Sequence, residues 1–307
     1  MSTTFLLIPW FRLDPWVITS WLKIQPFGIL VAIGIVFGTR IAEWRSEKVG
    51  IDPRLISDFL VYTIGIGLLS AMVLNVVFYD QEKIPEMGRS ISSLFRDGPW
   101  EPFPYPGLSS FGGFLGGVGA AFLFRARKGV SIAVMGDLFC FAFPFAWLFG
   151  RTGCFTVHDH PGLPSHFFLA VDNYDGMGVA RHDLGLYEVL WSLVAIGLNL
   201  WLGKRKLPRG FFMAFIPLLY APVRFFLDYL REIPAHGGDV RYFGFTPGQY
   251  GSLLMFVVGL MVAVRVARGP EPSVYVDGRE APVPPPEAES EPEPARTPKK
   301  KHAKRRA

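Results

Sequence analysis

The chain has 307 residues, of which half are hydrophobic and only 19% are charged. This composition is too apolar for an ordinary soluble domain and predicts a membrane protein. The formal net charge is +5, but the Lys and Arg residues gather in short clusters beside apolar runs, which indicates orientation in a membrane and not nucleic-acid binding. Cys140 and Cys154 are too few for a disulfide framework and lack zinc-site spacing, so we expect no structural metal and no cofactor.

Residues 1–26 are predicted to form an interfacial N-terminal arm. Pro9, Arg12, Asp14 and Pro15 interrupt a mildly apolar stretch that lacks the pattern of a cleavable signal peptide. The stretch also contains Trp10, Trp16 and Trp21, and tryptophans are enriched at the level of the lipid headgroups. We therefore expect the arm to be retained at the membrane surface.

Residues 27–268 contain about seven stretches that are long and apolar enough to cross a bilayer, which takes about 20 mainly apolar residues each. We expect spans at 27–44, 55–79, 108–124, 132–149, 186–202, 211–227 and 248–266. The sequence thus predicts an all-α, polytopic membrane bundle of about seven transmembrane helices. Seven crossings would put the two ends of the chain on opposite sides.

Basic residues follow every second span, and this alternation predicts the orientation. They are Arg40, Arg45, Lys48 and Arg54; Arg125, Arg127 and Lys128; Lys204, Arg205, Lys206 and Arg209; Arg265 and Arg268. The positive-inside rule places these junctions in the cytoplasm. The N-terminus and the segments 80–107, 150–185 and 228–247 are then outside.

Residues 269–307 change character, with Pro-Glu repeats that give way to a run of Lys and Arg. Such a segment cannot bury a core, so we predict a disordered cytoplasmic tail. We favour a solvated tail. The alternative is that its basic end contacts anionic lipid headgroups or ribosomal RNA.

Glycines are concentrated in the third span, at Gly112, Gly113, Gly116, Gly117 and Gly119. Small residues let helices approach closely in lipid, and we favour this packing role. The functional alternative is that the helix leaves room for a lipid substrate against its backbone.

Three polar clusters lie at the outer ends of spans, at 150–162, 181–188 and 224–231. Arg224, Asp228 and Arg231 follow helical spacings of four and three, so they share one helix face. Charged residues within or near the membrane usually face the interior of a helix bundle or a water-filled cavity. Arginines that converge there are suited to bind a lipid phosphate. The alternative is that Arg224 and Asp228 neutralise each other while Arg151 extends to the interface.

Histidines in the outer loops are weaker candidates, because a loop histidine is more often a solvated surface group. They are His158, His160 and His182. The His-x-His spacing with Asp159 between is too loose a pattern for a metal site, and we expect no metal.

These clusters, in this order and at these span ends, resemble the prolipoprotein diacylglyceryl transferase family. The matching motifs are the Gly-Arg-x-Gly run at 150–153, the triplet Leu186-Tyr187-Glu188, the segment 224–231 and the run 246–249, with weaker matches at Phe78-Tyr79 and 109–117. The resemblance covers roughly 27–266. It implies a multi-pass enzyme of the bacterial inner membrane, with a periplasmic N-terminus and a cytoplasmic C-terminus.

The family's reaction, as the resemblance implies, moves a diacylglyceryl group from phosphatidylglycerol to the lipobox cysteine thiol of a prolipoprotein. A thioether forms and glycerol phosphate leaves, so the implied partners are phosphatidylglycerol, lipobox segments and membrane lipids, without nucleic acid.

The resemblance also implies roles for individual residues. Arg151 and Arg224 would hold the phosphate and stabilise the leaving group, and Glu188 and Asp228 would orient them or the headgroup. Asp159 matches a family glutamate by position, and it or a neighbouring histidine, His158 or His160, is a candidate base. The expected substrate contacts are Arg151, Arg224, Asp228, Gly112, Gly113, Gly153 and Tyr187.

The chain departs from the family pattern at five positions. Phe111 replaces a histidine, Cys154 replaces an asparagine, Phe27 replaces a tyrosine, Met72 replaces an arginine and Asp228 replaces a glutamate. A non-catalytic or substrate-shifted lipid-binding paralogue is therefore an alternative function. A small-solute transporter is less favoured, because the sequence shows no internal repeat and no paired broken helices.

Overall fold

The computed structural model describes residues 7–18, 23–78, 80–96, 107–176, 178–232, 241–269, 275–276 and 279–280. Trp21, Tyr79 and most of the predicted tail lie outside these ranges, as does the side chain of Phe111. The prediction of a disordered tail is therefore not tested by the structure.

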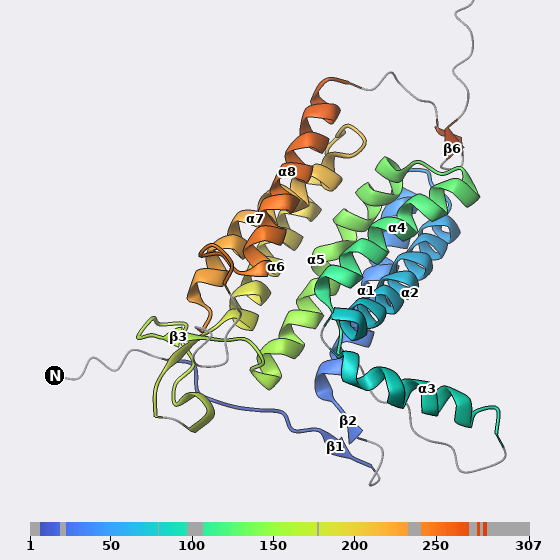
Figure 1. Cartoon of the computed structure of the whole chain (residues 1–307). Helices are drawn as coiled ribbons and strands as arrows, with labels where there is room; N and C mark the ends of the chain where they lie inside the picture. Colours follow the sequence, from blue (N-terminus) through green and yellow to red (C-terminus); the bar gives the residue numbers. More distant parts are fainter. Residues whose placement is uncertain are drawn as a thin grey trace, which may run out of the picture.

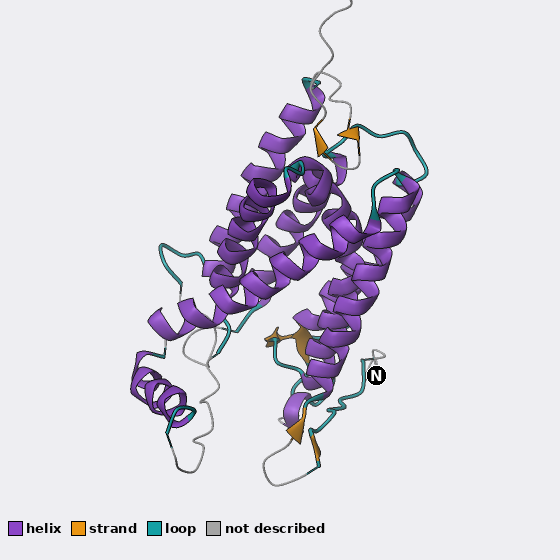
Figure 2. Ribbon diagram, turned by 90° about the vertical axis from the view of Figure 1, so that its right-hand side faces the viewer, coloured by secondary structure: helices purple, strands orange, loops and turns teal. Residues whose placement is uncertain are grey.

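Helices account for most of the described structure (Figures 1 and 2). At the places of the expected spans lie α1 (Pro26–Lys48), α2 (Pro53–Phe78), α4 (Ser110–Lys128), α5 (Ile132–Val157), α6 (Leu184–Leu202), α7 (Phe211–Leu227) and α8 (Pro247–Ala267). A shorter helix, α3 (Ile84–Ser93), follows α2. The prediction of an all-α, polytopic membrane bundle is confirmed.

The remaining elements are short and lie before α1, between helices or after α8. They are the hairpins β1 (Trp16–Val17) with β2 (Lys23–Ile24), β3 (Pro161–Pro164) with β4 (Arg181–Asp183) and β5 (Tyr275–Val276) with β6 (Arg279–Glu280), and the 3₁₀ turns η1 (Gln81–Lys83), η2 (Tyr174–Gly176) and η3 (Asp228–Leu230).

Six of the described helices are long and apolar enough to cross a membrane, namely α1, α2, α5, α6, α7 and α8. The helix at the place of the third expected span, α4, does not reach this hydropathy because its glycines contribute little and Arg125 and Arg127 end it. It nevertheless runs alongside α2 (Figure 1). The expected seven spans are thus six strongly apolar helices and one weaker one.

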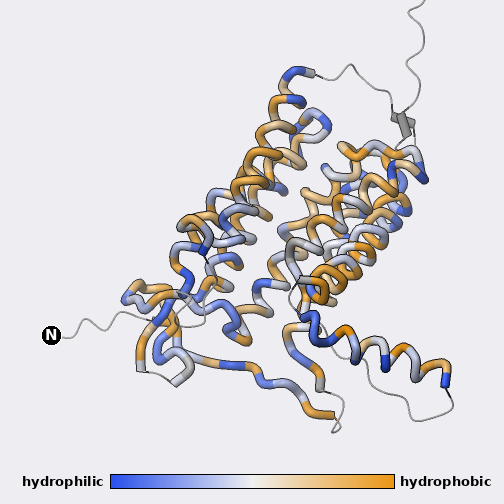
Figure 3. Tube along the Cα trace, in the orientation of Figure 1, coloured by the Kyte–Doolittle hydropathy of each residue, from blue (hydrophilic) through white to orange (hydrophobic). Residues whose placement is uncertain are grey.

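Helix α5 occupies the middle of the bundle (Figure 1). It packs against α1 on one side and against α6 and α7 on the other, while α2 pairs with α4 and α7 with α8. We call the end at which α5 and α7 stop and α6 and α8 start the site end, and the opposite end the basic end. Figure 3 shows apolar residues along the middle of the helices and hydrophilic ones gathered toward their ends.

At the basic end, two charged side chains hold helices together through backbone groups. Asp137 on α5 accepts hydrogen bonds from the amides of Phe212 (2.6 Å) and Met213 (3.2 Å) at the start of α7. Arg45 on α1 donates to the carbonyl of Gly203 at 2.8 Å, just beyond α6. Because a helix start leaves its first amides without intrahelical partners, Asp137 fixes α7 against α5.

At the site end, His158 connects three segments. It terminates α5 in a left-handed conformation, with φ of 51°. Its Nδ1 lies 2.6 Å from an oxygen of Asp183, whose other oxygen caps α6 by accepting from the amide of Leu186. Its Nε2 lies 2.5 Å from the carbonyl of Phe11 in the N-terminal arm, and Trp10 stacks on its ring. The arm, the end of α5 and the start of α6 are therefore held in one arrangement.

The pairing of α2 and α4 depends on glycine. A Cβ atom at Gly116 would lie 2.8 Å from the carbonyl oxygen of Ile66, whereas one at Gly119 would meet nothing within 4 Å. We predict that Gly116→Leu lowers the free energy of unfolding by about 1–3 kcal/mol, since the two helices must separate.

Gly119→Leu on the same helix is the matched control and should change stability by less than about 0.5 kcal/mol. Melting temperatures of the purified variants in one detergent measure both. Equal melting temperatures for the two variants would contradict this account of the α2–α4 contact.

Candidate active site

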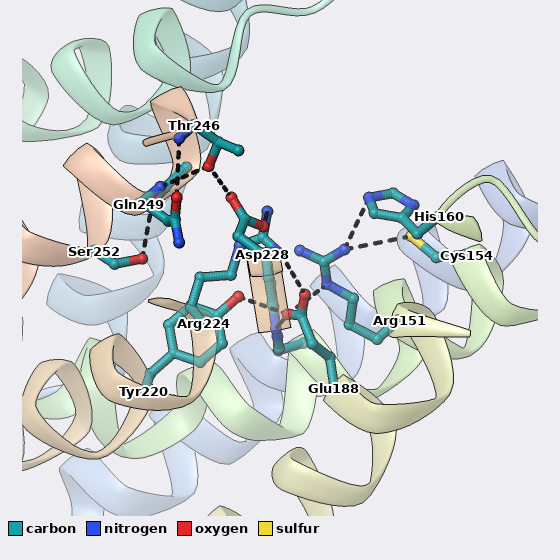
Figure 4. A network of polar contacts seen from close by, with 12 residues as sticks. Arg151, Cys154, His160, Glu188, Tyr220, Arg224, Asp228, Thr246, Gln249 and Ser252 are labelled. Carbon is teal, nitrogen blue, oxygen red and sulfur yellow. Dashed lines mark hydrogen bonds and ion pairs between the residues drawn. The ribbon is translucent and has the colours of Figure 1, made fainter. Parts of the chain in front are cut away.

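A buried carboxylate, Glu188 in the second turn of α6, lies at the centre of the polar network at the site end (Figure 4). One of its oxygens, Oε2, accepts hydrogen bonds from the hydroxyl of Tyr220 (2.5 Å) and the indole of Trp147 (3.0 Å). The same oxygen lies 2.9 Å from Nε of Arg151, and Oε1 lies 3.3 Å from Nη1 of Arg224. The contact between Arg151 Nε and Glu188 Oε2 is an ion pair but not a hydrogen bond, because Nε of Arg151 has no hydrogen-bond partner.

Arg151 comes from the last two turns of α5 and is 11% exposed. Its guanidinium lies over the ring of Trp147, 4.4 Å from the ring centre, and Nη1 lies 3.3 Å from Nε2 of His160 and 3.9 Å from the sulfur of Cys154. The contacts to Glu188, His160 and Cys154 are made through Nε and Nη1 of Arg151.

Arg224 comes from the last turn of α7 and forms a second ion pair one turn further along. Its Nη2 lies 2.9 Å from Oδ1 of Asp228, which is fully buried. The other oxygen of Asp228 accepts a hydrogen bond from the hydroxyl of Thr246. Thr246 in turn caps α8 in a reciprocal capping box with Gln249. The start of α8 is thereby fixed against the Arg224–Asp228 pair.

Backbone lies directly against this pair at Gly248. A Cβ atom there would collide with the carboxylate of Asp228 and would lie 3.3 Å from Nη2 of Arg224. Only glycine leaves the two charged groups in their observed positions, which gives the Gly in the 246–249 motif a physical reason.

The charges of this network balance, with two guanidinium groups facing two carboxylates. Each guanidinium carries five N–H donors, so both arginines can keep their carboxylates and still donate to another anion. Planar forks of this kind match the oxygens of a phosphate. The network, which we call the arginine cluster (Arg151, Glu188, Arg224 and Asp228), is therefore suited to a phosphate ester.

A second pair of titratable groups borders the arginine cluster. Nδ1 of His160 contacts a carboxylate oxygen of Asp159, and Nε2 faces Arg151. Burial alone would raise the pKa of Asp159, but the hydrogen bond and charge of His160, together with the charge of Arg151, hold that pKa below its ordinary value. Asp159 is thus ionised at neutral pH and is a weak proton acceptor, and a histidine is ordinarily the stronger base of such a pair.

Cys154, Asp159 and His160 are also close enough to be considered as metal donors, with one donor atom of each within 4.8 Å of the others. However, Nη1 of Arg151 lies between two of them and supplies a fixed positive charge there. A metal ion would have to displace this guanidinium, so we interpret the group as a hydrogen-bonded one.

The structure places some predicted site residues together and others apart. Arg151, Glu188, Arg224 and Asp228 form one network, as the three sequence clusters suggested. His158 is turned away from it, since both of its ring nitrogens contact Asp183 and Phe11. His160 takes the position beside Arg151 instead.

Tyr187 also lies apart from the arginine cluster. Its hydroxyl is 2.6 Å from Nδ1 of His182, whose pKa is lowered by burial. Both residues border the β3–β4 hairpin beside Phe167.

The three predicted glycines have packing environments. A Cβ atom at Gly112 would lie 2.6 Å from the carbonyl oxygen of Ser70, and one at Gly153 would lie 2.9 Å from the ring of Phe27. Gly113 has more space, with its nearest neighbour at 3.8 Å. Close packing accounts for Gly112 and Gly153, whereas a Cβ atom at Gly113 would make only ordinary van der Waals contact.

The sequence did not point to Trp147 or Tyr220, and it gave Thr246 only as part of the run 246–249, without a role. A signal was present for two of them, because Trp147 precedes Arg151 by four residues and Tyr220 precedes Arg224 by four. This spacing puts each aromatic residue on the same helix face as its arginine.

A cavity of about 230 Å³ lies between the arm, the start of α1 and the end of α5. Its lining residues are Arg12, Leu13, Pro15, Gln25, Phe27, Val157 and Asp159. Asp159 thus faces both His160 and this cavity.

Known proteins are similar to this chain over the region that contains the site. A family model described as prolipoprotein diacylglyceryl transferase matches residues 15–265. Phosphatidylglycerol–prolipoprotein diacylglyceryl transferase of Chromohalobacter salexigens is 27% identical over 251 residues, which cover 81% of this chain and 90% of the relative. The enzymes of that name from Clostridioides difficile (27%, 80% of this chain and 92% of the relative) and Chlorobaculum tepidum (28%, 76% and 82%) are similarly related.

The matched region contains six apolar helices, the arginine cluster and the Asp159–His160 pair, and it leaves out only the first residues and the tail. The resemblance seen in the short motifs is therefore confirmed over most of the chain, which belongs to the prolipoprotein diacylglyceryl transferase family.

Proposed function

We propose that this chain transfers a diacylglyceryl group from phosphatidylglycerol to the lipobox cysteine thiol of a prolipoprotein. The relatives are named for phosphatidylglycerol and prolipoprotein as the substrates of a diacylglyceryl transferase. The observation that carries the proposal is the convergence of Arg151 and Arg224, from two different helices, on the buried carboxylate of Glu188. A phosphodiester and a pair of fixed guanidinium groups are complementary.

In the reaction, the thiol sulfur attacks the glyceryl carbon that bears the phosphate. A C–S bond forms, the C–O bond to phosphate breaks, and glycerol phosphate departs with the electron pair. Arg151 and Arg224 hold the phosphate oxygens and stabilise the negative charge that grows on them. Glu188 and Asp228 keep the two guanidinium groups in place, so that little reorganisation is needed when the charge develops.

The proposed orientation puts the site end in the periplasm. Arg45, Lys48, Arg125, Arg127 and Lys128 lie at the opposite end, and positive residues favour the cytoplasmic side. We propose residues 1–26 as an interfacial arm, 27–268 as the transferase unit in the bacterial inner membrane and 269–307 as a cytoplasmic tail. Secreted prolipoproteins then meet the arginine cluster on the side to which they are exported.

The first prediction concerns Arg151. Purified protein mixed with phosphatidylglycerol vesicles and a lipobox peptide bearing a free cysteine should yield a thioether adduct with the mass of the diacylglyceryl peptide. Arg151→Ala should lower the initial rate at least about 100-fold, as expected when a group that stabilises developing charge is removed. Mass spectrometry of the peptide measures this rate.

Arg205→Ala is the matched control. The guanidinium of Arg205 also lies over a tryptophan, Trp201, but at the basic end, so the rate should stay near that of the unmodified chain. If the chain binds phosphatidylglycerol but yields no adduct, the proposed transferase activity is wrong and a lipid-binding paralogue is favoured. The departures from the family pattern at Phe111 and Met72 would then explain the lost activity.

The second prediction concerns Glu188. Glu188→Gln keeps the shape of the side chain but removes the charge that two buried guanidinium groups share. We expect a loss of about 3–5 kcal/mol of stability, the usual cost of breaking a buried ion pair from one side. Phosphatidylglycerol should raise the melting temperature of Glu188→Gln more than that of the unmodified chain, because the phosphate restores a counter-charge.

Glu82→Gln, at an exposed position in η1, controls for a general effect of charge. Equal stabilisation of Glu188→Gln and the unmodified chain by phosphatidylglycerol would argue against a phosphate site at the arginine cluster.

A further inference from the structure

The chain turns sharply at the end of α5, and this turn brings a histidine back to the arginine cluster. His158 adopts a left-handed conformation, and the amide of Asp159 donates to the carbonyl of Cys154. The two following side chains are thereby placed beside the last turn of the helix. His160 Nε2 comes to 3.3 Å from Nη1 of Arg151, as Figure 4 shows.

The hydrogen-bond partners of His160 determine its tautomer. A guanidinium can only donate, so Nε2 must be the acceptor and must lack a proton. Nδ1 then carries the proton and donates it to Asp159. In this tautomer the imidazole is oriented by a carboxylate, and its unprotonated nitrogen faces the group that would hold the phosphate. A carboxylate behind an imidazole in this way fixes the ring and stabilises the imidazolium that forms on proton uptake.

Three described histidines other than His160 differ in this respect. His158 uses both ring nitrogens in contacts with Asp183 and Phe11. His182 contacts the hydroxyl of Tyr187, and His166 is exposed in the loop after β3. Among the described histidines, His160 is the one whose ring nitrogen contacts the arginine cluster.

We propose that His160 is the catalytic base of the transfer and that Asp159 is its positioning residue. This inference rests on the proposed function, since it assigns the base of that same reaction. Nε2 takes the proton from the thiol as the sulfur attacks the glyceryl carbon. The C–O bond to phosphate breaks, and the proton passes from Nε2 to the departing glycerol phosphate. The cavity that Asp159 lines gives the acceptor peptide room on the side of the N-terminal arm.

The position of Arg151 couples this base to the donor lipid. With no anion present, the guanidinium beside Nε2 opposes a second positive charge on His160. A phosphodiester bound to Arg151 and Arg224 would offset the charge of the guanidinium beside His160.

The adduct assay tests the inference through its dependence on pH. His160→Gln should lower kcat/KM by about 100-fold or more at neutral pH, the usual contribution of a general base. Its rate should recover as the pH rises past about 8.5, where the thiol ionises by itself. Asp159→Asn should lower the rate less and move the acidic limb of the profile to lower pH, because the imidazolium loses its counter-charge. Free imidazole should restore part of the activity of His160→Ala.

His166→Gln is the matched control, and its pH profile should equal that of the unmodified chain. A His160→Gln variant with unchanged rate and profile would overturn the inference while the transferase itself stands. Loss of activity in His160→Ala without imidazole rescue, together with loss of stabilisation by phosphatidylglycerol, would show a structural role and would also overturn it. Absence of adduct with the unmodified chain would overturn the proposed function and this inference with it.

Discussion

One buried carboxylate, Glu188, determines how the site end of the bundle is arranged. A charge without water must be paired, and Glu188 is paired by two guanidinium groups and two aromatic donors from α5 and α7. These contacts fix α6 relative to both neighbours at the level where the chemistry is proposed. The second carboxylate, Asp228, extends the network to α8 through Thr246. Four helices are thus held together at the site end by one network of ion pairs and hydrogen bonds.

The same arrangement explains how an apolar bundle handles an anionic substrate. Because the arginine cluster is neutral before the lipid arrives, its two guanidinium groups are held in place without a net buried charge. Their remaining donors then meet the phosphate without a large rearrangement, which is the condition for effective electrostatic stabilisation. Asp159 and His160 lie outside this neutral set, so proton transfer and phosphate binding use different residues that meet at Arg151.

The sequence predicted the bundle and the charged part of the site because both leave strong local signals. Apolar runs revealed the helices, and charges such as Arg151 and Arg224 are conspicuous at membrane depth. Trp147 and Tyr220 were missed because aromatic residues are ordinary in apolar spans. The choice between His158 and His160 depended on a left-handed turn at the end of α5, and no residue pattern revealed it. The weak apolarity of α4 followed from its glycines, which serve its contact with α2.

The placement of the four charges also fits the order in which the helices are made. Arg151 on α5 is synthesised first, and its partner Glu188 arrives on the next helix, so the α5–α6 hairpin is already balanced. Arg224 and Asp228 lie one turn apart at the end of α7, so that helix brings its own counter-charge into the bilayer. Each step of insertion therefore needs at most one neighbouring helix to neutralise an ionised side chain. The four charges of the arginine cluster can therefore be paired progressively as the chain emerges, before the whole bundle is complete.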